Sequence, residues 1–144
     1  HVIGATGHTV VNVDTMTYAA TRDSTADVAA DPRYLHIQAD ITDGAAMRAV
    51  FTAHQPDAVM HLAAESHVDR SIDGPGVFMT TNVLGTFTLL QAARDYWSGL
   101  DAARQAAFRF HHISTDEVFG TLQPGDPPFT ETTPYDPRSP YSAY

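Results

Sequence analysis

Two adjacent carboxyl side chains, Asp116 and Glu117, follow an apolar run at residues 108–114 that is typical of a β-strand. Ligands of open α/β sheets bind beyond the carboxyl ends of the strands. A protonated carboxylic acid beside an ionised carboxylate can act as general acid and general base on one substrate. Neighbouring side chains of an extended segment point to opposite sides, so we expect the pair to address different atoms. The alternative is a solvated acidic turn.

Tyr141 is a further candidate for proton transfer. Tyrosine has a reference pKa of about 10, so it serves as a base near neutral pH only beside positive charge. That charge usually comes from a lysine one helical turn later and from a nicotinamide ring. Such a lysine would stand one position beyond Tyr144. The turn-forming residues 137–140 predict that a new element opens at Tyr141.

Four short apolar or alternating runs predict the strands that must position these groups, at residues 9–14, 34–40, 57–63 and 108–114. Helical spacing predicts a helix that Asp43 caps and Pro56 ends, a long helix from Pro75 to about Trp97, and a shorter one over residues 100–107. Strands that alternate with helices and are almost wholly apolar predict a parallel sheet with helices on both faces.

The fold class is therefore α/β, a Rossmann-like doubly wound parallel sheet. The long helix is expected to be mostly core, through Phe78, Val83, Leu84, Phe87, Leu90 and Ala93. Prolines recur through residues 120–140, which predicts an irregular segment there.

Gly4 and Gly7 resemble the glycine loop that holds a dinucleotide phosphate, but only His8 separates them from the next strand. A dinucleotide fingerprint needs a whole helix in that place. We therefore expect the end of a helix with a glycine at its cap, followed directly by the second strand of the fold. The first strand and its glycine loop are then expected before His1.

Acidic and small residues at the ends of the predicted strands suggest a cofactor site. Asp14 can accept both ribose hydroxyls of an adenosine and would repel a 2′-phosphate, which favours NAD over NADP; the alternative is a turn cap. Asp40 and Ile41, after the second strand, are open to two interpretations as well: a carboxylate near the adenine, or the N-cap of a loop. Small side chains let a cofactor approach the backbone after the third strand, at Leu62, Ala63 and Ala64; simple packing is the alternative.

The composition excludes several classes of protein. Acidic residues number 17 against 8 Lys and Arg, giving a net charge of −9 without any basic run, so nucleic-acid binding is not expected. There is no cysteine and no membrane-length apolar run, and we expect a soluble, cytoplasmic protein. His111 and His112 lie on opposite faces of a strand, so no metal site is expected.

The order and spacing of several motifs resemble the dTDP-glucose 4,6-dehydratase family of extended short-chain dehydrogenases/reductases. The resemblance spans the whole chain. The matching segments are residues 12–14, 17–19, 61–72, 114–120, 129–131 and 139–143, and the Asp-Glu pair within them is absent from related sugar-nucleotide epimerases. Thr15 and Ala20 depart from the usual Lys and Gly, and Tyr144 stands where Ser is usual.

The resemblance implies internally recycled NAD and conversion of dTDP-glucose to its 4-keto-6-deoxy form. By analogy, Tyr141 and Thr115 act at the 4-hydroxyl, Glu117 removes the C5 proton and Asp116 protonates the departing 6-hydroxyl. Ser66 matches a substrate contact, as Thr115 does. The positions that match the NAD site are Asp14, Asp40, Ile41, Leu62, Ala63, Ala64 and Thr81.

The resemblance also sets the expected boundaries of this protein's role. Residues 1–144 are expected to be part of a single NAD-binding domain, without the substrate domain, of a parent enzyme that is a homodimer. The alternatives are a UDP-glucose 4,6-dehydratase and a sugar-nucleotide epimerase. The 144 residues alone are expected to be inactive and unstable, because the strands beside a missing first strand would keep unpaired backbone groups.

Overall fold

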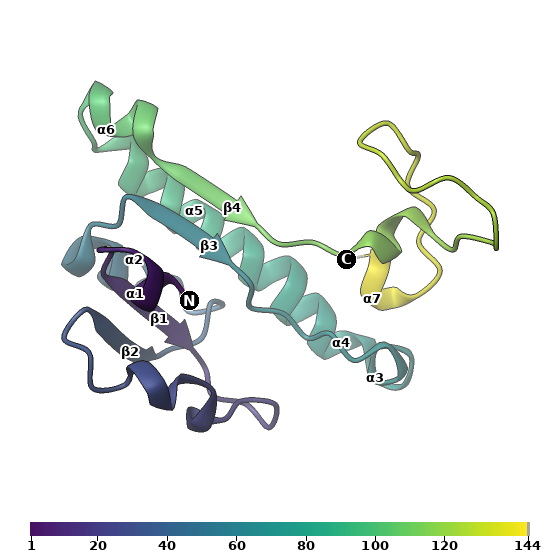
Figure 1. The fold of residues 1–144 in the computed structure, drawn as a ribbon, viewed down its shortest axis with the longest axis horizontal. Helices are drawn as coiled ribbons and strands as arrows, with labels where there is room; N and C mark the ends of the chain where they lie inside the picture. Colours follow the sequence, from purple (N-terminus) through teal and green to yellow (C-terminus); the bar gives the residue numbers. More distant parts are fainter. Residues whose placement is uncertain (144) are drawn as a thin grey trace.

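The computed structural model describes residues 1–143 and comprises two pairs of strands with helices packed beside them (Figure 1). Tyr144, the departure noted above, lies outside the described residues. The strands are β1 (Val10–Asp14), β2 (Tyr34–Gln38), β3 (Ala58–His61) and β4 (Arg109–His112). The helical elements are α1 (Val2–Ala5), η1 (Arg22–Val28), α2 (Gly44–His54), α3 (Val68–Asp73), α4 (Pro75–Phe78), η2 (Met79–Gly85), α5 (Thr86–Ser98), α6 (Ala102–Ala107), η3 (Asp116–Phe119) and α7 (Pro140–Ala143).

The α/β class with parallel strands is confirmed, and the strands form two separate pairs, which agrees with the expected gap where a first strand is missing. β1 pairs with β2, Val10 opposite Tyr34, and β3 pairs with β4, Ala58 opposite Arg109. Within residues 1–143 no strand hydrogen-bonds to both pairs. On β3 of this chain, His61 is 3% exposed and its neighbour Met60 is 59% exposed. One face of this pair therefore packs on the core and the other is open.

Helices α2 and α5 join the two pairs through one hydrophobic core. The Asp43 side chain caps α2 by accepting hydrogen bonds from the Ala45 and Ala46 amides at 2.9 and 3.0 Å. The helix ends at Gln55, in a left-handed conformation before Pro56. Both boundaries agree with the prediction. The core consists of Ile41, Met47, Phe51, Leu89, Ala92 and Ala93.

Gly85 lies where this core has no room for a side chain. A Cβ atom there would stand 2.7 Å from Ile41 Cδ1 and 2.8 Å from Cγ1. We expect Gly85→Ala to destabilise the protein by about 1–3 kcal/mol, the usual effect of overpacking. Denaturant unfolding of the full-length protein measures this. Gly76→Ala is the matched control, because nothing lies within 4 Å of a Cβ atom at Gly76; equal stability of the two variants would contradict the prediction.

The long helix from Pro75 to Ser98 is present, but its burial differs from the prediction. It comprises α4, a π-helical stretch (η2) and α5 without a break. Phe78 and Ala93 are buried as expected, whereas the four other predicted core positions are 42–57% exposed: Val83, Leu84, Phe87 and Leu90. The side that faces α2 is instead formed by Leu89, Ala92 and Ala93. No helix within residues 1–143 combines the length and the apolar character needed to cross a membrane.

The segment with Gly4 and Gly7 joins helix α1 directly to β1, as predicted. The expected glycine cap is wrong: the C-terminal cap is Thr6, and neither glycine has a positive φ. The Arg33 guanidinium satisfies this helix end instead, by donating to the carbonyls of Ile3 and Thr6 at 2.9 and 2.7 Å. Gly4 and Gly7 therefore precede β1 and lie near the amino ends of this strand pair, whereas Asp14 lies at the carboxyl end of β1.

Residues after β4 form a separate lobe that packs against α3 and α4 through α7 (Figure 1). Residues 120–139 contain no helix or strand, as predicted, whereas α3 was not predicted. The irregular segment folds back on η3, since the Asp136 amide donates to the Val118 carbonyl at 2.9 Å. Gly120, at φ 95°, permits this because a Cβ atom would lie 2.9 Å from the Asp136 carbonyl oxygen.

Candidate active site

The Asp-Glu pair lies in a short 3₁₀ helix, η3, and not on an extended segment. Thr115 is the N-cap, and its Oγ1 accepts a hydrogen bond from the Glu117 amide at 3.2 Å. The expectation that Asp116 and Glu117 point to opposite sides through strand geometry is therefore wrong, because the threonine cap bends the chain after β4. Both carboxyl side chains are exposed. The Thr115 hydroxyl hydrogen is not used by the cap and can be donated to a ligand.

Two neighbouring cavities meet beside this turn. The larger, about 550 Å³, is bounded by η3, the loop that holds Tyr135 and Pro137, and α7; its volume is within the range of about 300–1,000 Å³ usual for small-molecule sites. The smaller, about 190 Å³, lies toward the carboxyl ends of β3 and β4. Four residues line both cavities: Ser114, Thr115, Val118 and Ser142. Groups bound in the two cavities would therefore contact the same four residues.

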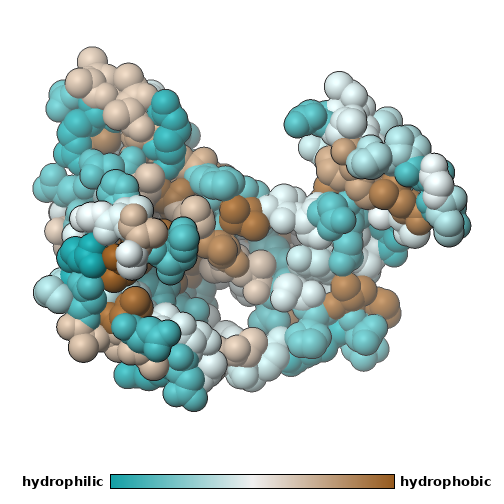
Figure 2. Space-filling view, in the orientation of Figure 1, coloured by the Kyte–Doolittle hydropathy of each residue, from teal (hydrophilic) through white to brown (hydrophobic). Residues whose placement is uncertain are grey.

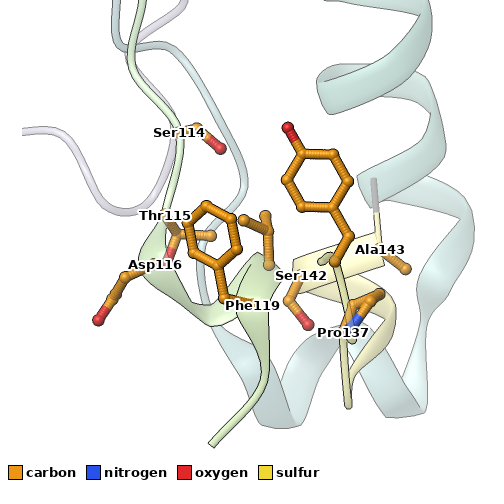
Figure 3. A pocket seen from close by; sticks show the side chains of 9 residues that line it. Ser114, Thr115, Asp116, Phe119, Pro137, Ser142 and Ala143 are labelled. Carbon is orange, nitrogen blue, oxygen red and sulfur yellow. The ribbon is translucent and has the colours of Figure 1, made fainter. Parts of the chain in front are cut away.

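The predicted catalytic residues lie differently around these cavities. Thr115 lines both, Asp116 lines the larger and Tyr141 lines the smaller. Glu117 lines neither. In Figure 3, Asp116 points away from Ser142 and Ala143, which come from α7 on the other side of the larger cavity. The structure therefore brings Thr115 and Tyr141 to one cavity and leaves the Glu117 carboxylate outside both.

Helix α7 holds Tyr141 through a buried contact to α3. The Tyr141 amide donates to Ser71 Oγ at 3.3 Å, and Ser71 is fully buried. Ser142 is buried as well. Its amide donates a hydrogen bond to Ser139 Oγ at 3.1 Å, and the two serine hydroxyl oxygens lie 3.0 Å apart. The turn at residues 137–140 indicated the start of this helix, but only tertiary packing places it against α3.

The predicted cofactor residues after β3 line the smaller cavity together: Leu62, Ala63 and Ala64, with Ser66 beside them. Their small side chains leave the backbone open to a planar ring at this edge of the strand pair. None of the residues that line this cavity is Asp, Glu, Lys or Arg, so an uncharged planar ring fits it better than a phosphate group does.

The other predicted cofactor residues have structural contacts of their own. Asp14 Oδ1 accepts a hydrogen bond from the Met16 amide at 2.6 Å, and Met16 has φ 59°. Asp40 Oδ1 accepts from the amide and the hydroxyl of Thr42, both at 2.8 Å. Both aspartates therefore stabilise turns, as the alternative interpretation held, and each uses one carboxylate oxygen in these bonds.

The side chains of Ile41 and Thr81 do not lie in either cavity. Ile41 is 7% exposed and belongs to the core beside Gly85. Thr81 lies one residue before Asn82, on the π-helical stretch η2.

Asn82, which no sequence pattern indicated, holds the loop after β3. Asn82 Oδ1 accepts from the Glu65 amide and Asn82 Nδ2 donates to the Glu65 carbonyl, both at 2.9 Å. The amide side chain satisfies both backbone groups of one residue, so the loop that carries Ala64 and Ser66 is fixed against η2. An amide on a helix has no periodic signature that would have revealed this role. The other residues of the smaller cavity that were missed are Thr86, His112, Ile113, Ser114, Val118 and Ser142.

His61 is a buried titratable group beside the smaller cavity. Its Nε2 lies 2.8 Å from Thr86 Oγ1, and its ring centroid is 5.0 Å from that of His112. Burial, with a smaller contribution from the neighbouring His112, lowers the pKa of His61 below its ordinary value of 6.5. The folded protein therefore holds this imidazole neutral.

The lowered pKa of His61 makes acid destabilisation an expected result. Below about pH 6.5 the unfolded chain takes up a proton that the folded chain excludes. The contribution of His61 is therefore complete above that pH and declines as the pH falls toward the lowered folded-state pKa. Denaturant unfolding of full-length protein between neutral and mildly acidic pH measures the loss. The free energy of unfolding of a His61→Gln variant should fall less steeply as the pH is lowered. An identical decrease in the wild type and the variant would contradict this assignment.

Three comparisons place the geometry among known proteins. The sequence profile of the family described as GDP-mannose 4,6 dehydratase matches residues 3–143. dTDP-glucose 4,6-dehydratase 1 of Escherichia coli K12 is 58% identical over 151 residues, covering 99% of this chain and 42% of the relative. The crystal structure of DesIV, a dTDP-glucose 4,6-dehydratase from Streptomyces venezuelae with NAD and TYD bound, has a TM-score of 0.82 and 42% identity over 96% of this chain and 39% of its own.

A structure of another activity is similar too. UDP-glucose 4-epimerase of Thermus thermophilus, in complex with NAD, has a TM-score of 0.75 and 25% identity, covering 93% of this chain and 38% of its own. The present chain thus spans about two fifths of the length of these relatives.

Within residues 1–143 no group of three or more His, Asp or Glu side chains is placed to hold a metal ion.

Proposed function

Because this chain belongs to the family described as GDP-mannose 4,6 dehydratase, we propose that it carries part of the NAD site and the proton-transfer residues of a nucleotide-sugar 4,6-dehydratase. The substrate is dTDP-glucose and the product is the 4-keto-6-deoxy sugar nucleotide. The relatives that resemble it at 52–58% identity bear the name dTDP-glucose 4,6-dehydratase. In this proposal, residues 1–144 are part of a single NAD-binding domain.

One observation carries the proposal: the two cavities share Thr115. The smaller contains Tyr141 and the small residues after β3, and the larger contains Asp116. A dehydratase must hold a sugar against both a redox cofactor and an acid-base pair. Thr115 lies where the two requirements meet, and its free hydroxyl hydrogen can bond to the sugar oxygen that changes oxidation state.

The residues present fit NAD. The small side chains of Ala63 and Ala64 admit a ring. The carboxylate of Asp14, at the end of β1, would repel a 2′-phosphate, which favours NAD over NADP. The residues proposed to hold it are Asp14, Asp40, Ile41, Leu62, Ala63, Ala64 and Thr81. When bound, NAD supplies a reversible hydride acceptor at the sugar.

The chain's own residues then account for the proton movements. Tyr141 takes the proton of the sugar 4-hydroxyl as C4 is oxidised, while Thr115 donates a hydrogen bond to that oxygen. The resulting ketone makes the C5 proton acidic. Glu117 removes it, and Asp116 protonates the departing 6-hydroxyl as water. The hydride that NAD would take from C4 would then return to C6, and the protonated Glu117 gives a proton back to C5, which completes the 4-keto-6-deoxy product. Ser66 contacts the sugar. Because Glu117 lines neither cavity as η3 now lies, substrate binding must include a reorientation of its exposed side chain.

The epimerases offer a second candidate, because a UDP-glucose 4-epimerase shares the fold. An epimerase needs the tyrosine and the cofactor but eliminates no water. The Asp116-Glu117 pair in the cap-stabilised turn favours a dehydratase over an epimerase. UDP-glucose instead of dTDP-glucose is the other alternative substrate.

Incubation of the full-length protein with dTDP-glucose tests the proposal. We expect a dTDP-4-keto-6-deoxyglucose product, seen by mass spectrometry as the loss of one water, without net consumption of added NAD. UDP-glucose in a parallel reaction tests the nucleotide. A C4 epimer of unchanged mass would establish the epimerase alternative and overturn this proposal.

We further propose a cytoplasmic homodimer. Support for the second copy comes from the exposed apolar stripe of α5 and the residues before it, with Val83, Phe87 and Leu90 at helical spacing. A Phe87→Glu variant is expected to sediment as a monomer, whereas Asp95→Asn on the same helix should not change the sedimentation. A dimeric Phe87→Glu protein would contradict the assignment of this stripe.

A further inference from the structure

Tyr18, in the loop after β1, reaches across to the loop after β3. Its hydroxyl donates to Glu65 Oε2 at 3.0 Å, and the Arg70 guanidinium carbon lies 4.0 Å from the centre of its ring. Among the described residues, the Tyr18–Glu65 bond is the only hydrogen bond that joins residues 1–43 to residues 58–143. It therefore links the loops at the carboxyl ends of two strand pairs that share no backbone hydrogen bond.

Both ends of this bridge are anchored. Asn82 holds the Glu65 backbone with its two 2.9 Å hydrogen bonds. On the other side, Asp14 Oδ1 fixes the Met16 amide and turns the chain sharply toward Tyr18. Because its two supports are held independently, the Tyr18–Glu65 contact has a defined span and is not a chance meeting of two flexible side chains.

The bridge lies beside the path that the proposed function gives to the dinucleotide. Figure 2 shows the molecule hollowed between the half with β1 and β2 and the segment with α3 and α4. In the proposed function the adenosine lies at Asp14, beside the pair of β1 and β2. The reacting ring lies beside Tyr141, in the cavity at the ends of β3 and β4. A ligand that reaches both must extend through this hollow, and the bridge joins the loops on its two sides.

We propose that Tyr18, Glu65 and Arg70 form a clasp that retains the bound dinucleotide, so that its release requires the Tyr18–Glu65 bond and the Tyr18–Arg70 stacking to break. This inference rests on the proposed function, since it takes the ligand to be NAD. It assigns these three residues a role in cofactor exchange and none in proton transfer. When the cofactor is regenerated within each turnover, slow release is an advantage to the enzyme, because it need not bind the cofactor again before the next turnover.

Cofactor exchange measures the clasp directly. The full-length protein is loaded with radiolabelled NAD and diluted into excess unlabelled NAD, and the retained label is followed by rapid filtration. Tyr18→Phe removes the hydroxyl and keeps the ring under Arg70, so we expect release about fivefold faster. Tyr18→Ala also removes the stacking, and release should be about 30-fold faster.

Tyr34→Phe is the matched control, since it removes a tyrosine hydroxyl bonded to Asn12 at 2.9 Å, away from the hollow. Its release rate should equal that of the wild type. Glu65→Ala should accelerate release as Tyr18→Phe does, and the double variant no further, because both remove one bond. Wild-type release rates for both Tyr18 variants, or additive effects of Tyr18→Phe and Glu65→Ala, would overturn the clasp. A wild-type protein that binds no NAD would instead refute the proposed function.

Discussion

A Glu117→Gln variant of the full-length protein is expected to form product at least about 100-fold more slowly than the wild type, because glutamine cannot accept the C5 proton. The substitution keeps the size of the side chain. It also leaves the main-chain amide that Thr115 caps unchanged, so η3 should remain folded. Product formation from dTDP-glucose, followed by chromatography, measures the loss.

Isotope exchange separates this residue from its neighbour. In deuterium oxide, Glu117→Gln should leave C5 of recovered substrate without deuterium. Asp116→Asn, which keeps the base but lacks the acid, should return substrate labelled at C5 although little product forms. Asp95→Asn, an exposed carboxylate on α5, serves as the charge-matched control and should turn over normally. Deuterium at C5 in the Glu117→Gln reaction would show that another group is the base.

Tyr141→Phe is expected to lower product formation by about 10²–10⁴-fold, the range for loss of a general acid or base. Phenylalanine retains the ring at the edge of the smaller cavity and cannot take the proton of the 4-hydroxyl. The backbone contact of residue 141 to Ser71 is unaffected, so α7 should keep its place. The measurement is again the rate of product formation from dTDP-glucose, with retention of the cofactor as the check on folding.

A substrate that is already oxidised distinguishes the two variants. When dTDP-4-ketoglucose is supplied in deuterium oxide, Tyr141→Phe should exchange C5 at close to the wild-type rate, because oxidation of C4 is no longer needed. Glu117→Gln should remain without exchange. If Tyr141→Phe fails on this substrate too, the tyrosine acts beyond the first step and its assignment as the base for the 4-hydroxyl is wrong.

Local signals were sufficient for much of the secondary structure. Asp43 and Pro56 bound α2 because a carboxylate satisfies free amides at the start of a helix and proline cannot continue one. The β-branched and alternating runs became parallel strands, and the missing helix between Gly7 and β1 excluded a phosphate loop at that place. Each of these features depends on residues a few positions apart in the chain.

The burial of the long helix could not be read in the same way. Its apolar residues lie on more than one side, and the sequence does not say which side meets α2. The narrow contact through Leu89, Ala92 and Ala93, with Gly85 against Ile41, decides the matter. Similarly, the four strands have similar sequence patterns, and these patterns do not show which strand pairs with which, because pairing partners are distant in sequence.

By itself, the sequence determined the α/β class, the parallel strands and the motif residues Thr115, Asp116, Glu117 and Tyr141 with the family they resemble. The tertiary structure alone decided that Thr115 caps a 3₁₀ turn, that Asn82 fixes the Glu65 backbone and that Tyr18 reaches Glu65 across 47 positions of the chain. The physical reason is that caps and periodicity act over a few residues, whereas a contact between distant side chains exists only after the packing of α2 and α5 has set where their loops lie.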